Sequence, residues 1–467
     1  MIRNGTTICA PATSGAGAIA VIRISGPESF AVCGKFFSPA ERKVKLRDQK
    51  GYTIIYGDIR QGDEIIDDVL VSIFRAPRSY TGEDSVEISC HASSFIQHRI
   101  LELLINNGAV AAKPGEFTLR AFLNGRLDLS QAEAVADLVA STSRAAHHLA
   151  INQIRGGFSA EIAKLRQELL HFASLIELEL DFGEEDVEFA GRKELREIVS
   201  RVRGMAESLA SSFKIGNVVR NGIPVAIVGK PNSGKSTLLN AMLMEERAIV
   251  SEIPGTTRDV IEDTINIDGI EYRFIDTAGL RDTPDLVESL GIRKTHEKID
   301  QASVILMIDE VTDNATAINK RADEIRQRIK HSGKRLFILI NKIDIGVPGN
   351  LNQLKRKIQI CKGESLMFIS AKEKTGLDEL RTRLGEVVEK ERLSSDSVII
   401  TNIRHYEALL RVSESLGRVG DGLNNSLPGD LIAIDLRQAI HYLGEITGEI
   451  TTEEILGNIF RNFCIGK

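Results

Sequence analysis

The sequence is short of three things: long apolar runs, paired cysteines and an excess of positive charge. Its longest apolar runs, such as Val304–Ile308, have the length of a strand and are far too short to span a membrane. The five cysteines are scattered and form no Cys-x-x-Cys pair, which argues against a disulfide framework and against structural zinc. The formal net charge of −6 means that nucleic acid would have to be bound by local basic patches. The N-terminus has no charged-then-apolar signal pattern, so we expect a cytoplasmic protein without a membrane partner.

Core material, in contrast, is plentiful. Of the 467 residues, 42% are hydrophobic and 27% are charged, which suits about three globular domains. Strand-like patterns over Ala18–Ile24, Val69–Phe74 and Val86–Ser89 are followed by a helical pattern over Ser94–Asn106. Residues 1–120 are therefore predicted to form a small α+β domain.

Helical patterns take over from residue 121. Ser130–Glu133 predicts a capping box that opens one long amphipathic helix, ended by Gly156-Gly157. Two more helices are expected over Ser159–Leu180 and Lys193–Lys214. We assign residues 121–216 to the first part of an α-helical domain.

Strands and helices then alternate regularly over residues 217–388. This is the pattern of a doubly wound, mostly parallel sheet, in which ligand loops follow the carboxyl ends of the strands. Five apolar runs predict strands near residues 223–228, 270–275, 303–308, 336–341 and 366–369.

Residues 389–467 read as helical again. Helices are expected over Ile403–Leu416 and Leu431–Leu443, and a last one is opened by Thr451–Glu454. Because so short a segment could barely bury a core of its own, we expect it to pack on the helices of residues 121–216. The domain of residues 217–388 would then be an insertion into the helical domain.

The central motif is Gly229–Ser236, which fits the phosphate-binding pattern of two glycines four residues apart followed by Lys and Ser. An apolar strand pattern precedes it over Ile223–Val228, and a helical pattern follows it from Thr237. Backbone N–H groups and a helix N-terminus would cradle phosphate there. Lys235 would reach the β- and γ-phosphates, and the Ser236 hydroxyl would bind Mg²⁺. The alternative is an ordinary strand–turn–helix connection.

Four further motifs follow in the order that a guanine-nucleotide protein requires. They are Gly255–Asp259, a switch loop; Asp276–Gly279, which faces Mg²⁺ and the γ-phosphate; Asn341–Asp344; and Ser370–Lys372. The Asp344 carboxylate can accept two hydrogen bonds from the N1–H and the amine of guanine, which adenine cannot offer. Together the motifs predict a GTP site.

A missing glutamine bears on the hydrolysis mechanism. Leu280 follows the Asp276–Gly279 motif, at the position where many small GTPases have a Gln that orients the attacking water. Oxygen atoms of Asn232, Ser251 and Ile253 could form a cage for a monovalent cation, and Glu288 could position the water. On the residues alone, a solvated helix position is the favoured interpretation of Glu288.

Several motifs together resemble the MnmE (TrmE) family of tRNA-modification GTPases, within the TrmE/Era group. The resemblance covers the whole chain, and the terminal Cys-Ile-Gly-Lys is its most specific part. The motifs that carry it are Gly229–Ser236, Gly255–Asp259, Asp276–Arg281, Arg23–Gly26, Ser79–Asp84, Lys113–Phe117 and Phe463–Lys467.

The resemblance implies a folate-binding N-terminal domain that forms a homodimer, a helical domain and an inserted GTPase domain activated by K⁺. Family members act with an FAD-dependent, MnmG-like flavoprotein, in a heterotetramer, on C5 of the wobble uridine of certain tRNAs. The group added is of the carboxymethylaminomethyl type. A 5-formyl- or 5,10-methylene-tetrahydrofolate supplies the one-carbon unit.

Carried over motif by motif, the resemblance assigns roles to individual residues. Glu288 becomes the catalytic carboxylate. The Mg²⁺ ligands would be Ser236 and Thr257, the K⁺ ligands Asn232, Ser251, Ile253 and Thr256, and the folate contacts Arg23, Glu87, Arg126 and Lys467. The residues expected to contact GTP are Asn232, Ser233, Gly234, Lys235, Ser236, Thr237, Ser251, Glu252, Ile253, Pro254, Gly255, Thr256, Thr257, Asp276, Thr277, Ala278, Gly279, Asn341, Lys342, Asp344, Ser370, Ala371 and Lys372.

Two of these positions depart from the pattern of some family members. Arg126 stands where Lys occurs, and Ser251 stands where Thr occurs; the charge and the oxygen ligand are kept. On the residues alone Arg23 would be a surface cation. Cys464 would be an exposed thiol or a packed apolar residue near a chain end that usually frays, and a reactive thiol is the alternative.

Two other kinds of GTPase are rival interpretations. A ribosome-assembly GTPase of the Era type would have a basic RNA-binding domain after its GTPase core. Residues 391–467 have seven Arg and Lys against eleven Asp and Glu, which disfavours that design. A septin-like structural GTPase gives no reason for the N-terminal domain.

Overall fold

The chain folds into two compact units in this computed structural model. One unit comprises Met1–Ala140, Leu149–Ser211 and Asn402–Lys467, and the other comprises Ser141–His148 and Ser212–Thr401. The residues that the structure describes are 5–13, 17–41, 45–181, 192–247, 263–275, 296–330, 333–387, 398–461, 463–464 and 466. Within these ranges, no helix is both long and apolar enough to cross a membrane.

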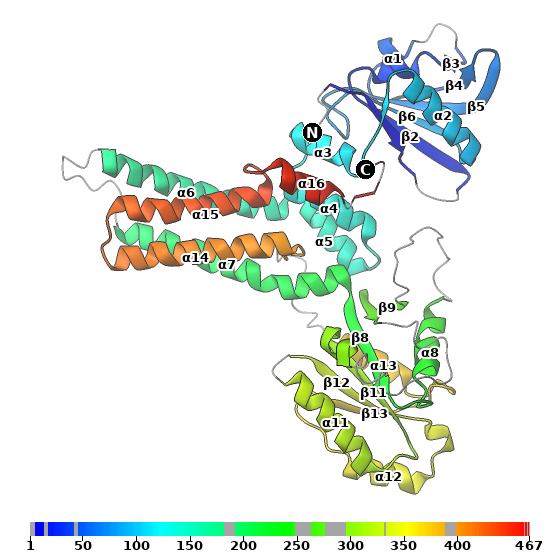
Figure 1. Ribbon diagram of the computed structural model, residues 1–467, viewed down its shortest axis with the longest axis vertical. Helices are drawn as coiled ribbons and strands as arrows, with labels where there is room; N and C mark the ends of the chain where they lie inside the picture. The colour runs from blue at the N-terminus through cyan, green and yellow to red at the C-terminus, as the bar shows by residue number, and fades with distance from the viewer. Residues whose placement is uncertain are drawn as a thin grey trace. The chain divides into compact units, whose positions relative to one another are not determined.

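A seven-stranded sheet forms the N-terminal part of the first unit, in the order β3-β4-β5-β6-β2-β1-β7 (Figure 1). Its neighbours are antiparallel except for the parallel pair β1 and β7. The strands are β1 (Ile8–Pro11), β2 (Ile19–Ser25), β3 (Phe37–Pro39), β4 (Thr53–Gln61), β5 (Glu64–Phe74), β6 (Ser85–His91) and β7 (Val110–Ala111). Helices α1 (Ser29–Cys33) and α2 (Ser94–Asn106) contact the sheet.

The core of this domain lies between one face of the sheet and α2. Ile22 and Ile88 are fully buried in one cluster with Ile100 and Leu104 of α2. The three strands and the helix predicted here are present, whereas the sequence pattern does not predict β4. The reason is that Ile54 and its neighbours make both faces of β4 apolar, so that polar and apolar residues do not alternate.

Helices make up the rest of the first unit and its connections to the second. Helix α15 packs on α14, α6 and α4, and α16 packs on α3 (Figure 1). Segments from before and after the second unit therefore share one bundle. The helices are α3 (Glu116–Leu123), α4 (Leu129–Ala140), α5 (Arg144–Ile154), α6 (Gly157–Asp181), α7 (Arg192–Asn221), α14 (Ile403–Asn424), α15 (Gly429–Thr447) and α16 (Glu453–Arg461).

Two details of the helix prediction are wrong. The single long helix expected up to Gly156 is two helices, because Ser143 interrupts the first: its hydroxyl accepts a hydrogen bond from the Ala146 amide and starts α5. The capping box of α4 lies two residues earlier than expected. Asp128 accepts from the Gln131 amide at 2.8 Å, and Gln131 accepts from the Asp128 amide at 2.9 Å.

The second unit contains the predicted doubly wound, mostly parallel sheet, in the order β13-β12-β11-β8-β10-β9 (Figure 1). Among the strands that the structure describes here, only β9 is antiparallel to its neighbour. Apolar clusters cover both faces of the sheet. The strands are β8 (Ile223–Gly229), β9 (Asp263–Ile267), β10 (Ile270–Phe274), β11 (Val304–Glu310), β12 (Arg335–Asn341) and β13 (Ser365–Phe368). The helices described are α8 (Lys235–Arg247), α11 (Ala315–Ile329), α12 (Pro348–Lys357) and α13 (Leu377–Gly385).

Candidate functional site

The phosphate-binding motif connects the end of β8 to the start of α8. Its two glycines stand where no side chain fits. A Cβ atom on Gly229 would lie 2.2 Å from the carbonyl oxygen of Ile308, and a Cβ on Gly234 would lie 2.2 Å from Nδ2 of Asn341. Gly234 has a φ of +97° and Asn232 a φ of +61°, so the loop turns through left-handed conformations. The backbone is thus shaped as a phosphate cradle requires.

Lys235 lies over this loop. Its Nζ donates to the carbonyl oxygens of Gly229 at 2.9 Å and Lys230 at 2.5 Å. The Ser233 hydroxyl also donates to the Lys230 carbonyl, at 3.0 Å. Burial, and then the charge of Lys298, lower the pKa of Lys235. Because the ammonium is partly shielded from water, its attraction to an anion is screened less than at an open surface.

The predicted base-binding motif is joined to the phosphate loop by one buried side chain. Asn341, the last residue of β12, donates through Nδ2 to the Ser233 carbonyl at 2.9 Å. Its Oδ1 accepts from the Ala371 amide at 3.0 Å. Asn341 therefore brings the phosphate loop and the segment after β13 to the same edge of the sheet.

Asp344 stands exposed beside this junction. The Ser370 hydroxyl donates to its Oδ1 at 2.6 Å, and this hydrogen bond lowers the pKa of Asp344. The carboxylate is thus held ionised in one orientation and can accept hydrogen bonds at neutral pH. Lys342 has a φ of +63° and an ion pair with Glu310 of 2.5 Å.

The remaining predicted GTP contacts divide into two groups. Ser236 is partly buried in the first turn of α8, while Thr237 on α8 and Lys372 after β13 are exposed. The other positions lie outside the described residues: Ser251, Glu252, Ile253, Pro254, Gly255, Thr256, Thr257, Asp276, Thr277, Ala278 and Gly279, together with Glu288 and Lys467.

A second constellation lies on β2 and β6 in the N-terminal domain. Arg23 Nε donates to Glu87 Oε1 at 2.8 Å, so two of the predicted folate contacts are paired directly. The Arg23 guanidinium also lies 5.2 Å from the ring centre of Tyr80 and 5.6 Å from that of Phe117. Its Nη1 donates to the carbonyl of Gly466 at 3.3 Å, which ties the end of the chain to this site.

Arg126, a predicted folate contact, and Cys464, the candidate reactive thiol, lie next to the same region. Arg126 is exposed and lies beside Gly82. A Cβ atom built on Gly82 would lie 3.2 Å from Cγ of Arg126. Gly82 is two residues from Tyr80 in the same loop. Cys464 is also exposed, and its carbonyl accepts from the Gly115 amide at 3.4 Å.

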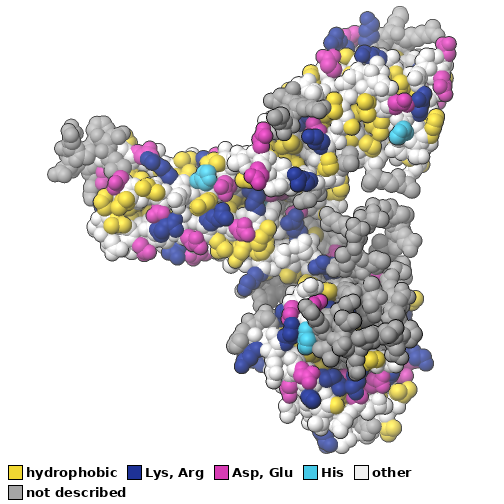
Figure 2. Space-filling model, in the orientation of Figure 1, with side chains coloured by type: hydrophobic (Ala, Val, Ile, Leu, Met, Phe, Trp, Pro, Cys, Tyr) yellow, Lys and Arg dark blue, Asp and Glu magenta, His cyan; other side chains and the backbone are white. Residues whose placement is uncertain are grey.

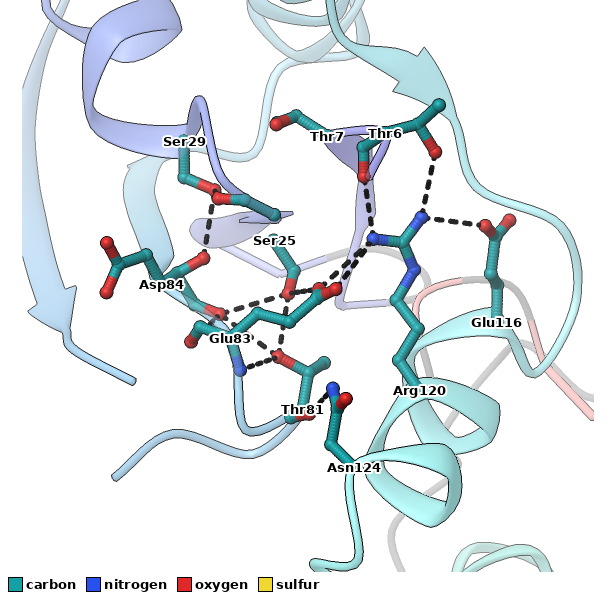
Figure 3. A network of polar contacts seen from close by, with 12 residues as sticks. Thr6, Thr7, Ser25, Ser29, Thr81, Glu83, Asp84, Glu116, Arg120 and Asn124 are labelled. Atoms are coloured by element: carbon teal, nitrogen blue, oxygen red, sulfur yellow. Dashed lines mark hydrogen bonds and ion pairs between the residues drawn. The ribbon is translucent and has the colours of Figure 1, made fainter. Parts of the chain in front are cut away.

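A polar network that the sequence did not predict holds this loop in place (Figure 3). Arg120 on α3, only 5% exposed, donates to both Glu83 oxygens at 3.1 Å and to the Thr6 carbonyl at 2.7 Å. Ser25 donates to Glu83 at 2.8 Å, and Asn124 donates to the Thr81 carbonyl at 2.7 Å. The one available signal was Glu116, four residues before Arg120 and ion-paired with it at 3.1 Å.

Comparison with known proteins assigns the chain. Residues 7–126 match the family described as GTP-binding protein TrmE N-terminus, and residues 129–464 match the MnmE helical domain. The tRNA modification GTPase MnmE of Bacteroides fragilis (strain YCH46) is 51% identical over 466 residues, which cover 99% of this chain and 100% of that protein. The chain belongs to the MnmE family of tRNA modification GTPases.

A second relative agrees with membership of the MnmE family. The MnmE protein of Flavobacterium johnsoniae is 52% identical over 468 residues, 100% of both chains. Among solved structures, an Aquifex aeolicus Era variant is 28% identical, with a TM-score of 0.26, over 41% of this chain and 66% of Era. The full-length family match decides against the alternative of an Era-type ribosome-assembly GTPase.

Proposed function

We propose that this MnmE family member binds GTP along the edge formed by β8, β11 and β12 and hydrolyses it to drive tRNA modification. The observation that carries the proposal is the double role of Asn341, which links the phosphate loop to the base-binding segment. In the bound complex the loop amides and Lys235 would hold the phosphates. Asp344 would accept hydrogen bonds from guanine, held in orientation by Ser370.

Two cations fit the donor chemistry of this site. Mg²⁺ prefers oxygen ligands, and we assign it to the hydroxyls of Ser236 and Thr257. We assign K⁺ to Asn232, Ser251, Ile253 and Thr256, and the left-handed backbone of Asn232 supports a side chain exposed at the loop. Bound there, the cations would neutralise charge that develops on the phosphates. Glu288 is our candidate for positioning the attacking water.

In the N-terminal domain we propose a tetrahydrofolate site. Arg23, Glu87, Arg126 and Lys467 would contact the folate, which is a 5-formyl or 5,10-methylene derivative supplying one carbon. A guanidinium, a carboxylate and two aromatic rings within 6 Å of the guanidinium suit a ligand that has a flat heterocycle and carboxylates. Cys464 lies near enough in sequence to Gly466 to be a candidate for chemistry at this site.

The full activity requires partners. We propose that the protein acts with an FAD-dependent, MnmG-like flavoprotein, as a heterotetramer in the cytoplasm, on C5 of the wobble uridine of certain tRNAs. The group installed is of the carboxymethylaminomethyl type. A homodimer through the N-terminal domain is supported by exposed apolar side chains on one face of β4 and β5, including Ile54, Tyr56 and Leu70.

Because the surface charge is mixed, we expect tRNA to be bound by local basic patches. Figure 2 shows Lys and Arg interspersed with Asp and Glu over the visible face of each unit. Neither visible face is therefore covered by charge of one sign, and we expect the salt dependence of tRNA binding to be set by the number of phosphates that local basic patches contact.

A complementation experiment tests the proposal. In cells that lack this chain, mass spectrometry of tRNA nucleosides should reveal loss of the wobble-uridine modification, and the wild-type chain should restore it. Lys235→Ala should fail because phosphate binding is lost. Arg23→Ala should fail although it retains GTP hydrolysis, while the matched control Arg99→Ala on α2 should complement. Unchanged tRNA nucleosides in the deletion strain would refute the proposed function.

A further inference from the structure

A chain of charged side chains runs from the phosphate loop to helix α11. Lys230 Nζ lies 2.8 Å from Asp313 Oδ1. Arg321 of α11 donates through Nη2 to Asp313 Oδ2 at 3.3 Å and to Asp309 Oδ1 at 2.5 Å. Asp309, near the end of β11, has a fully buried side chain. The row therefore begins at a half-exposed lysine and ends inside the domain.

Burying these charged side chains costs folding free energy, which suggests that they have a role beyond stabilising the fold. Among the atoms that the structure describes, Oδ2 of Asp309 and Nε of Arg321 are buried without a hydrogen-bond partner. Burial is also the main cause of a raised pKa at Asp309, and the hydrogen bond from Arg321 opposes it. A buried charge that is incompletely satisfied destabilises a fold, so a role other than stability would explain why this row is present.

Lys230 connects this row to the residue that would bind phosphate. Its side chain pairs with Asp313, while its main-chain carbonyl accepts hydrogen bonds from Lys235 Nζ and from the Ser233 hydroxyl. Asp313 is itself fixed, because its Oδ2 accepts from the Glu310 amide at 3.3 Å. The position of the Lys230 carbonyl, and with it that of Lys235, is therefore set from outside the phosphate loop.

We propose that Lys230, Asp313 and Arg321 are positioning residues that brace the phosphate loop, so that Lys235 is pre-oriented for the phosphates of a guanine nucleotide. The inference rests on the proposed function and adds three residues that are not among the predicted GTP contacts. A loop that is ordered before binding loses less entropy on binding. Breaking the brace should therefore weaken nucleotide affinity more than it slows turnover at saturation.

The test uses the full chain and titrates a fluorescent GDP analogue. Lys230→Met keeps the apolar stem of the side chain but loses the ion pair with Asp313. It should raise the dissociation constant about fivefold, which is the largest effect expected from losing one partly exposed ion pair. Turnover at saturating GTP should change less than twofold. Lys230→Arg should retain near-normal affinity, because a guanidinium can still reach Asp313.

Three comparisons distinguish a brace from simpler effects. Lys320→Ala removes a neighbouring exposed lysine on α11 and controls for net charge; it should leave the dissociation constant unchanged. In a double-mutant cycle, Asp313→Asn should cost almost nothing further once Lys230→Met is present. Melting of the nucleotide-free variants should match the wild type.

Several results would overturn the brace. The first is a dissociation constant for Lys230→Met within 1.5-fold of the wild-type value, and the second is an equal loss of nucleotide affinity in Lys320→Ala. The others are additive effects of Lys230→Met and Asp313→Asn on the dissociation constant, or a fall in the melting temperature of Lys230→Met that accompanies its loss of affinity. Failure of the proposed function would look different, since the wild-type chain would then bind GDP no better than ADP in the same titration.

Discussion

A buried ion cluster joins α4 to the helices that follow the second unit. Glu133 of α4 pairs with Arg404 at 2.8 Å and accepts a 2.7 Å hydrogen bond from His405, and the side chains of Glu133 and His405 are 7% and 1% exposed. Arg404 also donates to the carbonyls of Glu445 and Ile446 in α15. Arg404 and His405 belong to α14. Glu133→Gln keeps the shape of the side chain and removes its charge, so we predict that it weakens the packing of α4, α14 and α15 against one another.

The magnitude follows from the pKa of Glu133. Burial alone would raise this pKa, but the charges and hydrogen bonds of His405 and Arg404 outweigh burial and lower it from 4.5 to about 2. Each pKa unit corresponds to about 1.4 kcal/mol, so the whole shift is worth about 3 kcal/mol. At pH 7 this is an upper bound for neutralising Glu133, because burial lowers the pKa of His405 and leaves His405 neutral, acting through its hydrogen bond alone. Removing one partner of a buried pair generally costs about 3–5 kcal/mol. Because Arg404 keeps two carbonyl acceptors, we expect the lower value.

Hydrogen exchange can measure this loss in the intact chain. Peptides from α14 and α15 report the local free energy of opening, which a single global transition of a multidomain protein does not. In Glu133→Gln they should exchange about 100-fold faster, the equivalent of about 3 kcal/mol. The matched control is Glu177→Gln, which breaks the exposed pair between Glu177 of α6 and Arg437 of α15 and should cost less than about 1 kcal/mol. Wild-type exchange in the α14 peptides of Glu133→Gln would refute the reasoning.

Acid should weaken the same cluster. Burial lowers the pKa of His405 from 6.5, so below about pH 6.5 the unfolded chain binds a proton that the folded chain resists, and stability falls. The contribution of Glu133 is complete above pH 4.5 and is lost as the pH falls toward 2. The free energy of opening of the α14 peptides, measured by hydrogen exchange and corrected for the intrinsic exchange rate at each pH, should therefore fall from pH 7.5 to 4. The loss below pH 4.5 should be smaller in Glu133→Gln. An opening free energy independent of pH would contradict this assignment.

Two further predictions concern the nucleotide site. GTP hydrolysis should be much faster in K⁺ than in Na⁺ at equal ionic strength, because we propose that oxygen atoms of Asn232, Ser251, Ile253 and Thr256 bind K⁺; equal rates in steady-state assays would remove the cation site. Asp344→Asn should shift the preference from guanine to xanthine nucleotides, because the amide can donate to the second carbonyl of xanthine. Competition binding with GDP and XDP measures the shift, and a persistent preference for GDP would mean that Asp344 does not read the base.

The nucleotide site was the part most open to prediction from sequence. Its residues occur in short motifs at strand ends, so local pattern and the geometry of parallel sheets together place Gly229–Ser236 beside Asn341. The role of Asn341 as the bridge to Ala371 was not predictable, because it depends on two segments far apart in the chain. The positions in Ser251–Thr257 and Asp276–Gly279 stay predictions.

Long-range polar contacts explain the failures elsewhere. Ser130 and Glu133 match the spacing of a capping box, but both are buried, and Glu133 is used by Arg404 instead. Spacing alone cannot distinguish a carboxylate that caps its own helix from one that pairs with a residue 271 positions later. Arg120 is similar: only the fold brings it to Glu83 and Thr6.

The described residues of the C-terminal tail show what the fold adds to an expectation from sequence. Cys464 was expected to be an exposed thiol or a packed apolar residue near a chain end that usually frays, and it is exposed. Gly466, in contrast, is buried, and a Cβ there would lie 2.0 Å from the carbonyl oxygen of Pro11, so only glycine fits. Its carbonyl accepts from Arg23, and Gly115 packs against Phe460 just upstream. The tail is thus held at the Arg23 site from two sides, which is what a terminal motif needs if it is to take part in folate chemistry.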